Sequence, residues 1–310
     1  MWNRIEIITA MATPFKDNGE IDYPAVKHLA LYLADNGSDG ILVAGTTGES
    51  PTLSHDEKLS LFRTVKETVG ERVKVIAGTG LNSTKSTIDL SKEAEHTGVD
   101  ALLLVTPYYN KPPQKGLINH FKAIASLTKL PIILYNVPGR TGVNMTPHTV
   151  VSLSLETNII GIKEASGNLE QSAQMMKLTK ERLAEQNGNR KKEQFLLWSG
   201  DDSLTLPMLA LGATGVISVA SHLVGTEIKN MISEFNSGNH KTAQNIHERL
   251  LPFFNNCFIT TNPIPIKGAL EMAGIIREKV RPPLIELDPQ EKNRLRESML
   301  QLKLLRETVA

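Results

Sequence analysis

The run Ala101-Leu102-Leu103-Leu104-Val105 decides the fold of this chain. Its residues are apolar without polar alternation, which is typical of a strand covered on both faces in a parallel sheet. A comparable run recurs about every 30 residues, the length of one strand followed by one helix. The sequence therefore predicts eight β/α units. Their strands are Ile5–Met11, Gly40–Gly45, Val73–Gly80, Ala101–Pro107, Pro131–Val137, Ile159–Ser166, Phe195–Gly200 and Gly215–Ser221.

The segments between these strands carry signals for the start and the end of helices. Ser54 precedes Glu57 by three residues, which is the spacing of a capping box. Other predicted helices begin at Ser83, Thr146-Pro147 and Asn168. Predicted helix ends lie near glycines, where a left-handed cap costs little, at Gly37, Gly98 and Gly212.

Eight β/α units over residues 1–236 predict an α/β protein with a closed (β/α)8 TIM barrel. The alternative is an open, doubly wound sheet, but no Gly-x-Gly-x-x-Gly pattern follows the first strand. The nearest approach, Gly78–Ser83, ends in serine. Residues 237–310 contain no convincing strand and are predicted to form a C-terminal helical region. Its helices are His240–Phe254, Ile264–Ala273 and Pro289–Glu307, and the polar segment Gln186–Gln194 is predicted to be a surface loop.

Composition narrows the class of protein. Lys plus Arg number 34 against 33 for Asp plus Glu, and the net charge of +1 gives no reason to expect binding to nucleic acid or anionic membrane. The longest apolar runs fall far short of the ~20 residues needed to cross a bilayer. Met1–Glu6 lack the basic and apolar segments of an export signal, and the single Cys257 cannot form an internal disulfide. We therefore expect a cytoplasmic globular protein, and such proteins are most often enzymes.

Lys163 interrupts the apolar strand Ile159–Ser166 near its carboxyl end, where barrel enzymes place their active sites. Strand alternation puts Lys163 on the same face as Gly161 and opposite the isoleucines. If the isoleucines pack on the helices, Lys163 points into the barrel, and burial favours its neutral amine. A neutral amine attacks a ketone to form a Schiff base. The alternative for this strand alone is a lysine whose head reaches solvent or pairs with a carboxylate.

Three other strand ends carry polar residues suited to acid–base chemistry or to anion binding. Tyr135 can pass protons, or it can be a core tyrosine with a satisfied hydroxyl. Thr46 and Thr47 lie between two glycines, where backbone N–H groups can converge on a carboxylate; the alternative is an ordinary turn. Arg140 follows Pro138-Gly139, and its guanidinium suits a second carboxylate or a surface ion pair.

The sequence gives no support for a metal or an organic cofactor. The eight histidines are scattered, with no His-x-x-x-His pair and no companion cysteines, so a zinc site is not expected. Asp201-Asp202 is compatible with magnesium, but after Ser199-Gly200 it more readily begins a helix. Neither a Gly-x-x-x-x-Gly-Lys-Ser/Thr phosphate loop nor a Gly-x-Ser-x-Gly nucleophile turn is present.

Together the strand ends resemble those of the class I, pyruvate-dependent aldolase superfamily of dihydrodipicolinate synthase and N-acetylneuraminate lyase. Gly45-Thr46-Thr47-Gly48-Glu49, Tyr135-Asn136-Val137-Pro138 and Gly161-Ile162-Lys163-Glu164 match its signatures in order and spacing. The likeness extends from Thr9 to the stretch Asn262–Pro265. Within the superfamily the chain is most similar to the dihydrodipicolinate synthase family. The motifs that carry this closer likeness are Thr106–Pro112, Pro138–Gly142, Ser199–Asp202 and Gly215–Val219.

The resemblance implies a lyase that joins pyruvate to L-aspartate 4-semialdehyde. Lys163 would form an imine with pyruvate, and the derived enamine would attack the aldehyde. Ring closure would displace the lysine and give 4-hydroxy-tetrahydrodipicolinate, in the diaminopimelate route to L-lysine. The implied proton relay consists of Tyr135, Thr46 and Tyr109, with Tyr109 lent by a neighbouring subunit of a homotetramer built as a dimer of dimers.

The resemblance also implies which residues bind the substrates. Thr47 and Ile217 would hold pyruvate, and Gly200 would line the same pocket through its carbonyl. Arg140 would hold the carboxylate of the semialdehyde and position Tyr109. No cofactor and no metal are implied, because the lysine imine itself is the electron sink.

Two other functions compete with this one. An aldolase of the same superfamily that cleaves sialic acid or a 2-keto-3-deoxy sugar acid would share Lys163 and Tyr135 but would not need Arg140. A catalytically silent ligand-binding barrel is disfavoured, because Lys163, Tyr135, Thr46 and Tyr109 are all intact.

The resemblance extends to regulation. In lysine-inhibited relatives the effector binds at the interface of the tight dimer, beside the segments that match Ser50–Lys58, Asn82–Ser86 and Tyr108. Lys58 stands where those relatives commonly have histidine, and Ser86 where they have glutamate. We therefore expect weak or absent inhibition by L-lysine.

Overall fold

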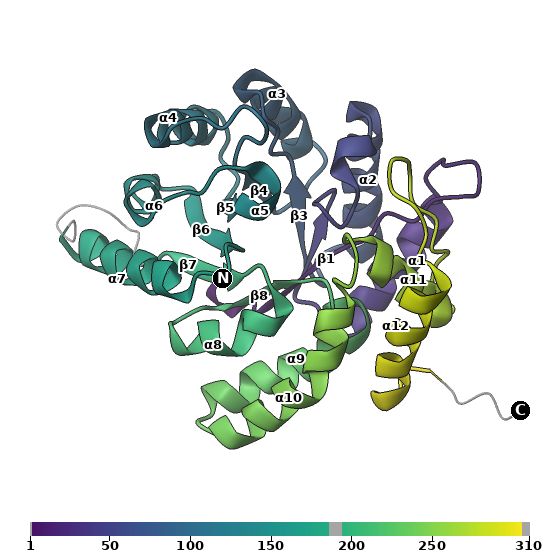
Figure 1. The fold of residues 1–310 in the computed structure, drawn as a ribbon. Coiled ribbons are helices and arrows are strands. Elements are labelled where there is room, and N and C mark those ends of the chain that lie inside the picture. Colours follow the sequence, from purple (N-terminus) through teal and green to yellow (C-terminus); the bar gives the residue numbers. More distant parts are fainter. Residues whose placement is uncertain (1, 186–193, 306–310) are drawn as a thin grey trace, which may run out of the picture. The chain divides into compact units, whose positions relative to one another are not determined.

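Figure 1 shows the computed structural model, which describes residues 2–185 and 194–305. Across these residues eight parallel strands close into a barrel in sequence order. This confirms the predicted (β/α)8 fold and excludes the open sheet. The strands are β1 (Ile7–Ala10), β2 (Gly40–Val43), β3 (Lys74–Gly78), β4 (Ala101–Val105), β5 (Ile132–Asn136), β6 (Ile159–Glu164), β7 (Leu196–Ser199) and β8 (Gly215–Ser218).

The strands are shorter than predicted at one or both ends, where the chain leaves the ladder and joins the adjacent loops. Every residue of β1, β2, β7 and β8 is buried. Burial on both faces explains why the runs lack polar alternation.

Helices alternate with the strands and then continue beyond the last strand. The α-helices are α1 (Tyr23–Asp35), α2 (His55–Val69), α3 (Thr84–Glu95), α4 (Gln114–Ala125), α5 (Pro138–Thr141), α6 (Pro147–Ser154), α7 (Leu169–Glu185), α8 (Thr205–Ala210), α9 (Ser221–Asn236), α10 (His240–Asn256), α11 (Ile264–Met272) and α12 (Pro289–Gln301). The described residues also form the short 3-10 helices η1 (Trp2–Arg4), η2 (Ser50–Thr52) and η3 (Asp202–Leu204). In the described ranges no helix has the length and apolar character needed to span a membrane.

The local helix signals act as the sequence predicts. Ser54 and Glu57 form both hydrogen bonds of a capping box at the start of α2. The side chain of Ser83 caps α3 by accepting from Ser86 N–H. The three predicted helix-ending glycines all adopt positive φ angles: 93° at Gly37, 82° at Gly98 and 90° at Gly212.

Contacts divide the chain into two compact units. The first unit comprises Met1–Glu6 and Ile76–Ile217, and the second comprises Ile7–Val75 and Ser218–Ala310. Within the first unit β4, β5, β6 and β7 pair side by side with α3 to α8 around them (Figure 1). Within the second unit α9, α10, α11 and α12 pack against one another.

The C-terminal helices are confirmed with one correction. α12 ends at Gln301, not at Glu307. Lys303 adopts a left-handed φ of 57°, its N–H donates to Leu300 O, and Leu304 N–H donates to Met299 O. These bonds form a Schellman motif, which terminates the helix by satisfying its last carbonyls.

The surface loop and the domain boundary stay predictions. The predicted loop at 186–194 lies outside the described residues except for Gln194, which is exposed. The division into a barrel at 1–236 and a helical region at 237–310 stays a prediction.

Candidate active site

Lys163 lies one residue before the end of β6 and is only 5% exposed. The register of the barrel sets Tyr135 of β5 directly beside it. Lys163 Nζ lies 4.5 Å from the centroid of the Tyr135 ring. Among the described residues no carboxylate forms an ion pair with Lys163. The alternative reading, a lysine that reaches solvent or is neutralised by a carboxylate, is therefore not what the structure shows.

Small residues make room for this lysine. A Cβ atom at Gly200 would lie 3.2 Å from Lys163 Cε and 2.6 Å from the Cβ of Ala165. On the other side of Lys163, the register pairs it with Trp198, whose indole N–H donates to Ile5 O at 2.8 Å. A Cβ at Gly161 would lie 2.8 Å from that indole ring. Glycines at 161 and 200 thus leave space for Trp198 and for the lysine side chain.

A buried polar network lies one residue beyond the lysine, and sequence reasoning missed it. Glu164 is 2% exposed, and its carboxylate accepts from Ser166 N–H at 2.6 Å and from Asn136 Nδ2 at 2.9 Å. Asn136 Oδ1 in turn accepts from Met145 N–H at 2.9 Å. Burial raises the pKa of Glu164 despite these hydrogen bonds. The network ties the ends of β5 and β6 together next to Tyr135.

The sequence signal for this network was a polar pair at the end of each strand. Asn136 follows Tyr135, and Glu164 follows Lys163. Successive residues of a strand point to opposite faces, so one member of each pair points into the barrel and the other points away from it.

Tyr109 and Arg140 occupy the loops that follow β4 and β5. Tyr109 has a left-handed φ of 72°, its side chain is 90% exposed, and its N–H donates to Thr141 O at 3.4 Å. Arg140 is exposed on the short helix α5, where its N–H donates to Val137 O at 2.9 Å. Backbone contacts bring these two loops together. The ring of Tyr109 does not pack into its own chain.

The remaining predicted residues lie at the ends of β2 and β8. Ile217 of β8 is 1% exposed. In the second unit Thr46 O accepts from Glu49 N–H at 3.0 Å, which closes a turn directly after β2. Thr47 is 2% exposed, and its Oγ1 accepts from Asn262 Nδ2 at 3.0 Å. The segment after β2 is therefore a hydrogen-bonded turn in which the side chain of Thr47 is held by Asn262.

In the part of the chain that the structure describes, no group of three or more His, Cys, Asp or Glu residues is placed to hold a metal ion. Asp201 instead caps η3 by accepting from Ser203 N–H at 2.9 Å. The helix-start reading of Asp201-Asp202 is therefore confirmed.

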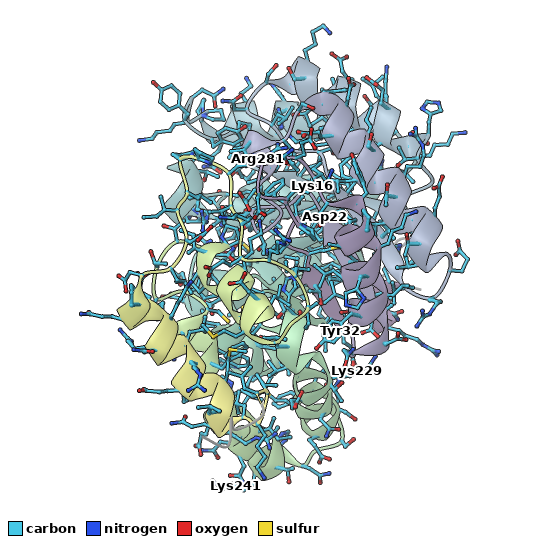
Figure 2. The ribbon with its side chains drawn as sticks, turned by 90° about the vertical axis from the view of Figure 1, so that its right-hand side faces the viewer. Lys16, Asp22, Tyr32, Lys229, Lys241 and Arg281 are labelled. Carbon is cyan, nitrogen blue, oxygen red and sulfur yellow. The ribbon has the colours of Figure 1, made fainter. Side chains whose placement is uncertain are left out.

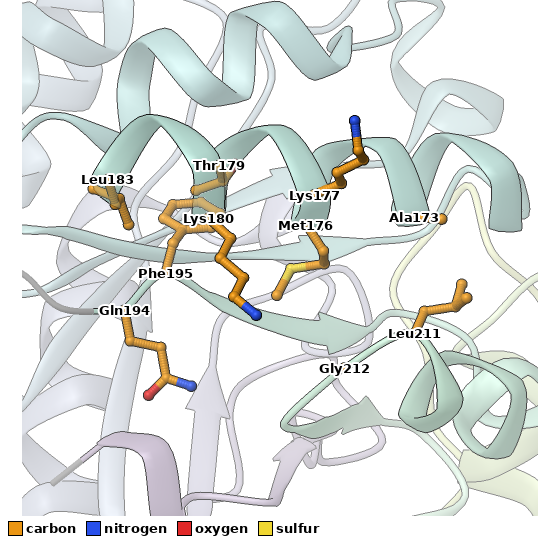
Figure 3. A pocket seen from close by; sticks show the side chains of 10 residues that line it. All are labelled: Ala173, Met176, Lys177, Thr179, Lys180, Leu183, Gln194, Phe195, Leu211 and Gly212. Carbon is orange, nitrogen blue, oxygen red and sulfur yellow. The ribbon is translucent and has the colours of Figure 1, made fainter. Parts of the chain in front are cut away.

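A cavity of about 690 Å³ lies along α7 (Figure 3). Its lining includes Met176, Lys180, Phe195 and Leu211. Phe195 precedes β7 and Leu211 precedes β8, so the cavity lies at the amino-terminal ends of these strands and is not the candidate site.

A closed parallel barrel with a buried, unpaired lysine beside a tyrosine at neighbouring strand ends defines a protein of the class I aldolase type. The chain belongs to the dihydrodipicolinate synthetase family, whose model matches residues 3–302.

Named relatives agree with this assignment. A 4-hydroxy-tetrahydrodipicolinate synthase of Dehalococcoides mccartyi is 53% identical over 293 residues, which cover 94% of this chain and 95% of that protein. The structure of dihydrodipicolinate synthase from Cyanidioschyzon merolae with lysine bound has a TM-score of 0.91 at 46% identity, covering 98% of this chain and 99% of the other. A structure described as the first monomeric dihydrodipicolinate synthase variant has a TM-score of 0.92 at 39% identity, covering 98% of each chain.

Proposed function

We propose that this chain condenses pyruvate with L-aspartate 4-semialdehyde to give 4-hydroxy-tetrahydrodipicolinate, on the diaminopimelate route to L-lysine. The observation that carries the proposal is the buried, unpaired Lys163 against the ring of Tyr135. Relatives at about half identity over nearly the whole chain are named for this synthase. The competing sugar-acid aldolase is disfavoured by the same relatives and by Arg140 in the loop after β5.

Lys163 supplies the nucleophile. Its free amine attacks the ketone of pyruvate and forms a carbinolamine. Loss of water gives the imine, and loss of a methyl proton gives the enamine that attacks the aldehyde. No metal or organic cofactor is needed, because the protonated imine accepts the electron pair.

Tyr135, Thr46 and Tyr109 form the proposed proton relay. The ring of Tyr135 already lies against Lys163, so its hydroxyl can exchange protons with the carbinolamine and the imine. Thr47 and Ile217 are proposed to hold pyruvate, with the Gly200 carbonyl lining the pocket. Arg140 is proposed to bind the carboxylate of the semialdehyde.

The relay needs a second subunit in this proposal. Tyr109 is 90% exposed in the single chain, and its loop is fixed by Asn110 Nδ2, which donates to Asn82 O at 2.8 Å. A large exposed aromatic on a fixed loop suits insertion into a neighbouring subunit. The exposed ring supports at least a dimer, and from the resemblance to the family we propose a cytoplasmic homotetramer built as a dimer of dimers. A fully active monomer in sedimentation at nanomolar concentration would contradict this assembly.

Reductive trapping tests the chemistry directly. Borohydride added with pyruvate should attach a pyruvate-derived mass to the peptide that carries Lys163 and to no other lysine. Lys163→Arg keeps a long basic side chain but cannot form this imine, so turnover should fall on the order of a thousandfold or more. Lys177→Arg on the exposed face of α7 is the matched control and should keep full activity. Labelling at another lysine would overturn the proposal.

A further inference from the structure

We propose that the buried ion pair between Lys267 and Glu49 positions the Thr46-Thr47 turn, so that helix α11 sets the geometry of the pyruvate carboxylate site. This inference rests on the proposed function and adds positioning residues to it. The pair lies within the second compact unit, 218 residues apart in sequence.

Glu49 belongs to the turn itself. Its N–H closes the turn by donating to Thr46 O, and its backbone adopts a left-handed φ of 56°. A residue with a Cβ avoids this conformation unless its surroundings hold it there. The orientation of the Glu49 side chain and the shape of the turn are therefore coupled.

Both oxygens of the Glu49 carboxylate are occupied. Lys267 Nζ donates to Oε1 at 2.5 Å, and Arg281 N–H donates to Oε2 at 2.9 Å. The side chains of Lys267 and Glu49 are 0% and 1% exposed. The ammonium also donates to Lys279 O at 2.5 Å and lies 4.3 Å from the centroid of the Phe15 ring. The ammonium of Lys267 and the carboxylate of Glu49 hold each other in one position, because moving either group would leave the other as a buried charge without its partner.

Neighbouring residues of the turn are held as well. Asn262 Nδ2 donates to Thr47 Oγ1, and Thr13 Oγ1 donates to Gly48 O at 2.7 Å. Three successive residues, from Thr47 to Glu49, are thus anchored through their side chains or backbone. Asn262, Lys267 and Arg281 all lie after α10, in the C-terminal helical region.

The side chain of Arg281 makes further hydrogen bonds that support the contact between its backbone N–H and Glu49. It is labelled in Figure 2 and lies within the second unit. Its guanidinium donates to both oxygens of Glu57, to Thr52 O and to Gly19 O. These bonds fix the loop on which the Arg281 backbone N–H meets Glu49.

A purely structural ion pair would stabilise the fold without affecting substrate affinity. A positioning pair acts through the turn that carries Thr47, which is proposed above to hold pyruvate. Loosening the turn should therefore raise the KM for pyruvate more than the KM for the semialdehyde, and should speed amide exchange at 45–49.

The test compares Lys267→Met with Lys292→Met in the full-length protein. Lys292 pairs with Glu278 in the same C-terminal region, but that pair makes no bond to the turn. For Lys267→Met we expect the pyruvate KM to rise about tenfold, the equivalent of one lost hydrogen bond. Hydrogen exchange at Gly45–Glu49 should accelerate, and the semialdehyde KM should stay within about twofold. The control should show none of these changes.

Glu49→Gln is the second variant, because it keeps the shape of the side chain if Lys267→Met does not fold. Its amide must turn an N–H₂ group toward either Lys267 or the Arg281 N–H, so the same rise in pyruvate KM is expected. An unchanged pyruvate KM and unchanged exchange at 45–49 in a folded variant would overturn the inference alone. Failure of the unsubstituted protein to form the pyruvate imine would overturn the proposed function and the inference together.

Discussion

Lys163 Nζ lies 4.5 Å from the centre of the Tyr135 ring, on the strand next to its own. The parallel register between β5 and β6 fixes this relationship, since the two residues are direct partners across the ladder. A nucleophile and a proton donor on adjacent rigid strands need no loop movement to meet. The first prediction separates the contribution of the ring from that of the hydroxyl.

Tyr135→Phe should keep the ring against Lys163 and remove only the phenol. We expect kcat to fall about 10²- to 10⁴-fold, the usual contribution of one general acid–base group. Thermal unfolding should change little, because the ring still fills its place in the barrel. Stopped-flow measurement of imine formation and steady-state kcat would show the loss. A variant with full kcat would remove Tyr135 from the relay.

Arg140→Ala should weaken the use of L-aspartate 4-semialdehyde more than imine formation with pyruvate. A charge-assisted contact to a carboxylate contributes ~1.5–3 kcal/mol, so kcat/KM for the semialdehyde should fall roughly tenfold or more. Borohydride trapping with pyruvate should proceed as in the unsubstituted protein. Equal losses in both measurements would show that Arg140 acts on the loop rather than on the second substrate.

His222 should make the fold sensitive to acid. Burial lowers its pKa to about 4, and its ring is fixed with Nε2 accepting from Ala12 N–H at 3.0 Å. Its other nitrogen lies 2.8 Å from Val219 O and acts as the donor there. Only the neutral ring satisfies both contacts.

The unfolded chain takes up a proton at His222 near pH 6.5, whereas the folded chain does so only near 4. The contribution of His222 is therefore fully present above pH 6.5 and is lost as pH falls toward 4, by about 3 kcal/mol. Urea unfolding of His222→Gln between pH 8 and pH 4 should show a shallower loss on the acid side. His240→Gln, at an exposed histidine, is the control. If the unsubstituted protein, His222→Gln and His240→Gln all lost the same free energy of unfolding between pH 8 and pH 4, His222 would not be the source of the acid sensitivity.

Inhibition by L-lysine should be weak or absent. Lys58 is 5% exposed and burial lowers its pKa, so it does not point to solvent. Ser86 is exposed on α3 and offers no negative charge to an incoming ammonium. Losing one anion and adding one cation near a bound lysine should weaken its affinity more than about tenfold.

A lysine titration in steady state decides this prediction. The expected result is half-inhibition well above the millimolar range, and half-inhibition below it would prove the reading of Lys58 and Ser86 wrong. Lys58→His combined with Ser86→Glu should increase sensitivity to lysine. The same double variant should leave the KM for pyruvate unchanged, which distinguishes an effector site from a disturbed active site.

Local chemistry determined most of the architecture. Apolar runs such as Leu102–Val105 have no solvated face, so they predict buried parallel strands whatever the rest of the chain does. Ser54 and Glu57 cap a helix through bonds within one turn, and Gly98 ends one through its own φ angle. Such interactions depend on neighbours in sequence, and sequence therefore predicts them. The end of α12 was missed because Lys303, a residue that rarely adopts a left-handed φ, takes the place of glycine there.

The sequence by itself determined the barrel, its strand order and the position of Lys163 near a strand end. Only the tertiary structure decided that Lys163 is buried without a carboxylate partner, that Glu164 bonds to Asn136 28 residues away, and that Glu49 meets Lys267 218 residues away. The pairing of a buried polar group depends on which distant side chains the closed fold brings within hydrogen-bond reach. That choice is made by strand register and helix packing, which no local pattern of residues encodes.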